Sequence, residues 1–72
     1  MVKKNKIKIN LNGKVISVDK GINLAKLIIK YKFSLNKIAI EKNRLIVDKK
    51  KINKIFLKSN DRIEVVHFIG GG

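Results

Sequence analysis

The chain ends in three consecutive glycines, Gly70, Gly71 and Gly72, which directly follow the apolar residues Phe68 and Ile69. Glycine has no side chain and high backbone freedom, so this run predicts a narrow, flexible tail that can enter a channel too tight for side chains. The reactive group of the tail would be the α-carboxylate of Gly72. The pattern indicates a domain that delivers this carboxylate to the active site of another protein. Taken alone, a terminal glycine run is more often a frayed end or a cloning remnant than a functional tail.

Other side chains give weaker chemical signals. His67 is the sole histidine, and it has no Ser, Cys or carboxylate partner at a recognisable spacing, so we interpret it as a strand residue near a docking surface. Asp61 and Glu64 are interpreted as turn and surface residues. Cysteine is absent, which excludes a disulfide scaffold and a thiolate nucleophile. No metal-ligand cluster and no phosphate-binding loop is present, and we expect no catalytic residue.

The chain of 72 residues is strongly basic, with 18 Lys and Arg against 5 Asp and Glu and a net charge of +13. Such a charge raises non-specific affinity for nucleic acid. Nearly all the basic residues are lysines, however, whereas nucleic-acid-binding proteins favour Arg and stacking aromatic side chains. We therefore interpret the lysines as a solvated surface. No apolar run is long enough to span a membrane, so a cytoplasmic protein without a membrane partner is expected.

Residues 6–18 predict a β-hairpin. Apolar and polar residues alternate on both sides of Asn12-Gly13, a pair typical of a two-residue type I′ turn. Closing this turn would place Leu11 opposite Lys14, Ile9 opposite Ile16 and Ile7 opposite Val18, with the apolar residues on one face.

A helix is predicted over residues 24–32, capped by the side chain of Asn23. Apolar residues recur there at the spacing of one helix face: Leu24, Leu27, Ile28 and Tyr31. Such a helix would lie across the apolar face of the hairpin.

The rest of the chain predicts three more strands. Residues 38–41 and 45–47 flank a turn at Asn43-Arg44, and Lys49-Lys50-Lys51 reads as a polar break before a short helical turn at residues 52–57. Residues 59–62 form a turn in which Asn60 can adopt a left-handed backbone. Residues 62–68 form the last strand, with Ile63 and Val65 on its inner face.

This order of elements predicts an α+β fold of the β-grasp (ubiquitin-like) type, a mixed sheet of four to five strands packed on one helix. The last strand would pair centrally with the first and carry its end beyond the sheet. We expect one domain at residues 1–69 and a flexible tail at residues 70–72, because so short a chain buries a single small core.

The sequence resembles the ThiS family of sulfur carriers in thiamine biosynthesis over nearly its whole length. The resemblance is greatest from Asn60 to Gly72, and it continues in residues 38–43 and 21–28. Asn60 and Arg44 stand where the family commonly has glycine. Asp48-Lys49 stands where the family often has a Pro-Arg pair.

The resemblance implies a carrier that is no enzyme and binds no cofactor. A ThiF-type adenylyltransferase would use ATP and magnesium to activate the carboxylate of Gly72, which by itself has no good leaving group. Sulfur from a cysteine desulfurase would then displace AMP and leave a C-terminal thiocarboxylate, the sulfur donor for a thiazole synthase of the ThiG type. Gly70 and Gly71 would provide reach, while His67, Phe68 and Ile69 would dock on the partners.

Two other functions stay open on the sequence alone. A sibling carrier with the same tail chemistry could serve molybdopterin synthesis or tRNA thiolation. A small RNA-binding β-grasp module would use the lysines and not the tail, and its binding would fall steeply with salt.

Overall fold

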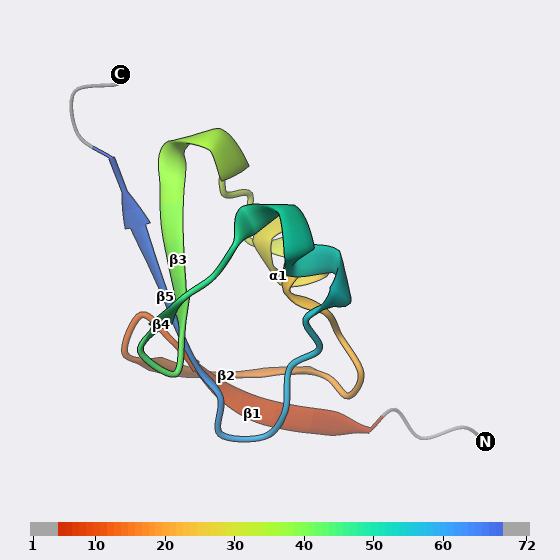
Figure 1. Ribbon diagram of the computed structural model, residues 1–72. Coiled ribbons are helices and arrows are strands. Elements are labelled where there is room, and N and C mark those ends of the chain that lie inside the picture. The colour runs from red at the N-terminus through yellow and green to blue at the C-terminus, as the bar shows by residue number, and fades with distance from the viewer. Residues whose placement is uncertain (1–4, 69–72) are drawn as a thin grey trace.

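The computed structural model describes residues 5–68, in which one mixed sheet of five strands packs against one α-helix (Figure 1). The strand order is β2-β1-β5-β3-β4. This arrangement confirms the predicted α+β fold of β-grasp type. The elements are β1 (Lys6–Leu11), β2 (Lys14–Asp19), α1 (Leu24–Lys30), η1 (Leu35–Lys37), β3 (Ile38–Lys42), β4 (Leu45–Ile46), η2 (Lys49–Lys54) and β5 (Arg62–His67), η1 and η2 being 3₁₀-helices.

The β1–β2 hairpin has the predicted turn and register. Asn12 and Gly13 have positive φ angles of 51° and 86°, as a type I′ turn requires. The Gly13 amide also donates to Oδ1 of Asn10 at 2.9 Å. The three predicted cross-strand pairs are present: Leu11 with Lys14, Ile9 with Ile16 and Ile7 with Val18.

Helix α1 begins where the sequence predicted, because Oδ1 of Asn23 accepts a hydrogen bond from the Lys26 amide at 2.8 Å. Its inner face buries three of the four predicted residues: Leu24, Leu27 and Ile28.

The predicted end of α1 was wrong, since the helix stops at Lys30 and Tyr31 is 39% exposed. Lys32 adopts a left-handed backbone with φ of 60°. The Phe33 amide then donates to the Ile28 carbonyl at 3.1 Å, and the Lys32 amide to Ile29 at 3.0 Å. This is the bond pattern of a Schellman motif, which ends the helix two residues earlier than the apolar spacing suggested.

The polar break predicted at Lys49-Lys50-Lys51 was also wrong, because helix η2 begins there. Oδ1 of Asp48 accepts from the Lys50 amide at 2.9 Å and so caps the first turn. Ile52 is the residue of η2 that plugs the core, whereas Phe56 lies beyond the helix and is 57% exposed.

Strand β5 lies in the middle of the sheet beside β1, as predicted. It runs parallel to β1 and antiparallel to β3. Ile63 and Val65 point into the core. No helix within residues 5–68 is both long and apolar enough to cross a membrane. In the described part of the chain the core consists of twelve buried apolar residues: Ile9, Leu11, Val18, Leu24, Leu27, Ile28, Ile38, Ile40, Ile52, Leu57, Ile63 and Val65.

Candidate functional site

The candidate site is the C-terminal end of β5, where the chain leaves the sheet (Figure 1). We call His67 and Phe68 the tail root. His67 pairs with Ile38 of β3, and the Phe68 amide donates to the Lys37 carbonyl at 2.9 Å. The chain is therefore held by backbone hydrogen bonds up to the last residue that the structure describes.

The opposite end of β5 is fixed by a cluster of polar side chains. Asp61 is only 8% exposed, and its Oδ2 accepts from the Lys58 amide at 2.8 Å. Its Oδ1 accepts from Nδ2 of Asn43 at 3.1 Å, and Oδ1 of Asn43 accepts from the Arg62 amide at 2.8 Å. The turn role predicted for Asp61 is confirmed, but the surface role was wrong, because these bonds satisfy the carboxylate in a buried position.

Asn12 provides a second anchor for β5. Its side-chain Oδ1 accepts from the Val65 amide at 2.8 Å, and its own amide donates to the Ile63 carbonyl at 2.9 Å. The hairpin turn thus holds the middle of the strand that carries the tail.

Lys49 connects the start of η2 to the tail root. Its Nζ donates to the carbonyls of Leu35 at 2.9 Å and Ile38 at 2.7 Å, and lies 5.3 Å from the centre of the Phe68 ring. The last distance is within the range of a cation–π contact. One ammonium group therefore links η2, the η1–β3 corner and the Phe68 ring.

The side chains of the tail root lie at the surface. Phe68 is 56% exposed, so it lies outside the core. The His67 ring lies 5.8 Å from the Phe33 ring with an interplanar angle of 45°. Neighbouring Val66 is 57% exposed, so two apolar side chains, Val66 and Phe68, are accessible at the end of β5.

The other predicted site residues, Ile69, Gly70, Gly71 and Gly72, lie outside the described residues. Between residues 5 and 68 no group of three or more His, Cys, Asp or Glu side chains is placed to hold a metal ion. The geometry is that of a strand end that is firmly anchored in the sheet up to Phe68.

Comparison with models of known protein families identifies the family of this chain. The model of the ThiS family matches residues 3–72, a range that includes both β5 and the terminal glycines. The chain belongs to the ThiS family. This confirms the resemblance seen in the sequence.

Individual relatives agree with membership of the ThiS family. The sulfur carrier protein ThiS of Bacillus subtilis is 32% identical over 65 residues, which cover 89% of this chain and 98% of that protein. An uncharacterized protein, ycf40, of Trieres chinensis is 36% identical over 62 residues, covering 86% of this chain and 85% of that protein. A thiazole synthase of Magnetococcus marinus is 39% identical over 66 residues, covering 92% of this chain. The chain spans only 20% of that synthase.

A solved structure of the ThiS family has the same fold. The crystal structure of a thiamine biosynthesis protein (ThiS) from Geobacter metallireducens superposes with a TM-score of 0.80 at 25% sequence identity, covering 92% of this chain and all of that one.

Sequence reasoning missed Lys49 as a residue that supports the tail root. Lys49 stood out only as a departure from the Pro-Arg pair that the ThiS family often has. The available signal was Asp48, a good N-cap residue directly before it. A helix that begins at Lys49 would have replaced the predicted polar break. The Lys49 side chain could then have been expected to face the domain.

Proposed function

We propose that the chain is a ThiS-type sulfur carrier of thiamine biosynthesis and that Gly72 carries the sulfur. The observation that supports this most is the match to the family model, which runs through β5 to Gly72. The anchoring of β5 on both sides supports the same conclusion, since it gives the terminal residues a fixed base. The domain at residues 1–69 is then a handle, and residues 70–72 are the part that enters partner active sites.

In the proposed cycle the Gly72 carboxylate attacks the α-phosphate of ATP in a ThiF-type, magnesium-dependent adenylyltransferase, and pyrophosphate leaves. A sulfur nucleophile supplied through a cysteine desulfurase then attacks the acyl carbon, and AMP leaves with the electron pair of the broken bond. A persulfide nucleophile gives an acyl disulfide at Gly72. A thiol then attacks the sulfur of the former persulfide cysteine, forms a disulfide with it and releases a thiocarboxylate at Gly72. All covalent steps take place in partner enzymes, so the carrier itself needs no catalytic residue.

We further propose a thiazole synthase as the acceptor of this sulfur. The supporting observation is that a protein named thiazole synthase contains a stretch similar to nearly all of this chain. His67, Phe68 and Ile69 would contact the partners beside their active sites. Since the cycle consumes ATP, we expect it to run in the cytoplasm.

Intact-mass measurement tests the proposal directly. The purified chain is incubated with ATP, magnesium, its adenylating enzyme and a sulfide source. We expect a mass gain equal to the replacement of one oxygen by sulfur, and no gain for a chain that lacks Gly72. An unchanged mass with an enzyme that demonstrably consumes ATP would contradict the proposal.

A further inference from the structure

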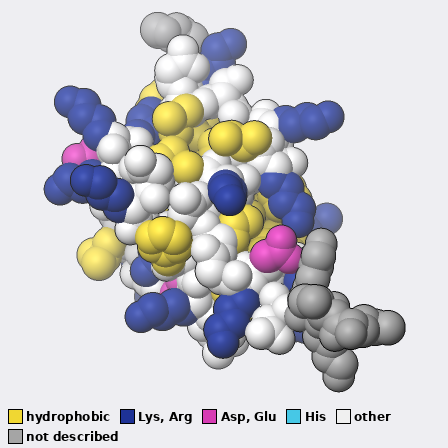
Figure 2. Space-filling view, turned by 90° about the vertical axis from the view of Figure 1, so that its right-hand side faces the viewer, with side chains coloured by type: hydrophobic (Ala, Val, Ile, Leu, Met, Phe, Trp, Pro, Cys, Tyr) yellow, Lys and Arg dark blue, Asp and Glu magenta, His cyan; other side chains and the backbone are white. Residues whose placement is uncertain are grey.

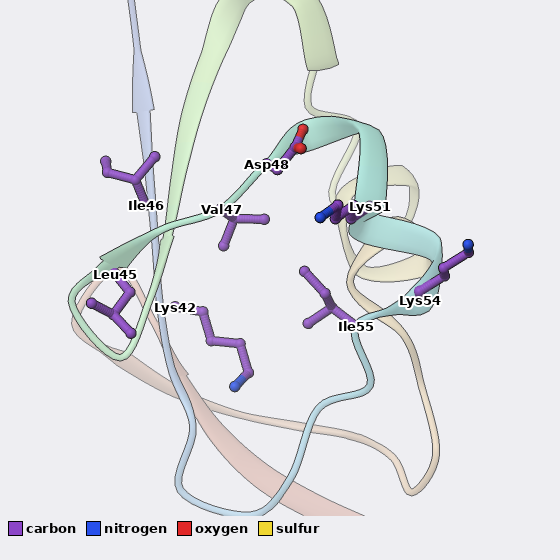
Figure 3. A pocket seen from close by; sticks show the side chains of 8 residues that line it. All are labelled: Lys42, Leu45, Ile46, Val47, Asp48, Lys51, Lys54 and Ile55. Carbon is purple, nitrogen blue, oxygen red and sulfur yellow. The ribbon is translucent and has the colours of Figure 1, made fainter.

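A hollow of about 400 Å³ lies on the side of η2 that faces the β3–β4 hairpin (Figure 3). The side chains of Lys42, Val47 and Ile55 point into it. In the β-sheet register, Lys42 pairs with Ile63 and with Leu45. The hollow therefore lies at the end of β5 opposite to the tail root.

The wall of the hollow is apolar and partly open to solvent. Leu45, on the two-residue strand β4, is 73% exposed, while Val47 and Ile55 are half-buried against the core. An exposed leucine beside two further apolar side chains forms a surface that gains free energy when it is covered.

The rim of the hollow is positively charged. Within residues 5–68 neither the Lys51 nor the Lys54 ammonium has a hydrogen bond or an ion pair, and Lys42 has only a 3.9 Å contact with Asp61. The one carboxylate of the lining, Asp48, is engaged in capping η2. Lysine side chains can lay their methylene groups along apolar surface and extend their charges to a ligand.

The residues of the hollow indicate which class of molecule can bind there. The lining has no Arg and no aromatic side chain, so it offers no stacking platform for the bases of a nucleic acid. A second copy of the chain would also carry a net charge of +13 and would be repelled. A ligand with an apolar side chain and neighbouring carboxylates fits best, because the apolar group can pack against the wall and the carboxylates can pair with the lysines of the rim.

We propose that the hollow docks a protein partner through a segment in which an apolar side chain is flanked by Asp or Glu. Docking there leaves the tail root free, so a partner can hold the carrier while the tail reaches an active site. We identify this partner as the adenylating enzyme, and that identification rests on the proposed function. The chemistry of the hollow does not depend on it.

A peptide titration followed by NMR of the ¹⁵N-labelled chain tests the hollow itself. The probe is a capped peptide of Glu, Asp, Leu, Asp and Glu. We expect shifts at Leu45, Val47, Lys51 and Ile55, and about tenfold weaker binding to the Leu45→Ser variant because a leucine contact is lost. Val15→Ser is the matched control, since Val15 is 68% exposed on the other edge strand, β2. The control variant should bind the peptide like the parent chain.

Three results would overturn the proposal. The first is an equal response to peptides with Gly in place of Leu or Lys in place of the acids. The second is a stronger response of the hollow to a short uridine RNA, which would assign it to nucleic acid. The third is shifts at these residues when the chain alone is concentrated, which would assign the hollow to a second copy.

Binding of the adenylating enzyme tests the role of the hollow in the cycle. Lys51→Glu should weaken enzyme binding about tenfold, and Lys50→Glu, the same charge change on the same helix, less than about twofold. The difference should persist in a chain without Gly71 and Gly72. Equal binding of both variants while Gly72 still gains sulfur would refute the docking role and leave the carrier function intact. Localised peptide binding without sulfur gain would refute the carrier function alone.

Discussion

Asp61 anchors the N-terminal end of β5 through its buried carboxylate. Its buried carboxylate accepts from the Lys58 amide and from Asn43, so its removal leaves donors in a poorly solvated site. We expect Asp61→Ala to lower the free energy of unfolding by about 2 kcal/mol, and Asp61→Asn by less, because one oxygen remains. Urea denaturation measures both, and a loss equal to that of a Glu64→Ala variant, whose side chain is half-buried, would contradict this account.

Arg44 has a backbone conformation that does not suit its residue type. Its φ angle is 72° in the turn after Asn43, in the left-handed region where a Cβ atom is unfavourable. We expect Arg44→Gly to raise the free energy of unfolding by about 0.5–1 kcal/mol. Arg44→Ala removes the same charge but keeps the Cβ atom, so thermal denaturation should show no comparable gain for that variant. Equal gains for both would assign the effect to charge.

At the scale of elements, helix η2 supports the tail root through Lys49. Lys49→Met keeps the apolar stem but removes the donor to the Leu35 and Ile38 carbonyls. We expect a loss of stability of about 1 kcal/mol and faster hydrogen exchange of the Phe68 amide. Lys50→Met on the same helix is the control. If exchange at Phe68 is the same in both variants, Lys49 does not support the tail root.

The elements differ in how far the sequence predicts them. The β1–β2 hairpin was predicted with its register because Asn12-Gly13 is a local signal that fixes a turn by itself. The end of α1 was not, since a lysine at position 32 gives no sign of the left-handed conformation it adopts. The burial of Asp61 depends on Asn43, 18 residues away, and no local pattern contains such a contact. The position of β5 as the last strand was predicted from the sequence, but the support that Lys49 gives to its C-terminal end was not.

Across the whole molecule, the positive charge acts against the fold. Figure 2 shows lysine and arginine side chains spread over the visible face, with few carboxylates among them. The radius of gyration is 12.6 Å, so at low salt, where the Debye length is about 30 Å, these charges repel one another across the molecule. We expect the melting temperature to rise between about 0.01 M and about 0.15 M sodium chloride. A melting temperature independent of salt would show that the repulsion is negligible.

The same charge should have the opposite effect on association. An acidic partner surface is attracted over a distance that shrinks as salt is added. We expect the association rate constant with the adenylating enzyme to fall with ionic strength in stopped-flow measurements, with a smaller change in the dissociation rate constant. An association rate constant that does not respond to salt would mean that the lysines do not steer this encounter.

The position of β5 also determines how the protein bears mechanical load. Because β1 and β5 are parallel neighbours, a force that pulls the beginning of β1 away from the end of β5 makes the two strands slide along each other. The bonds between them, such as those from the amides of Asn10 and Asn12, are then loaded together instead of opening one after another. A pull on the end of β5 with the beginning of β1 held would thus have to break these bonds together, which resists unfolding more than breaking them one at a time.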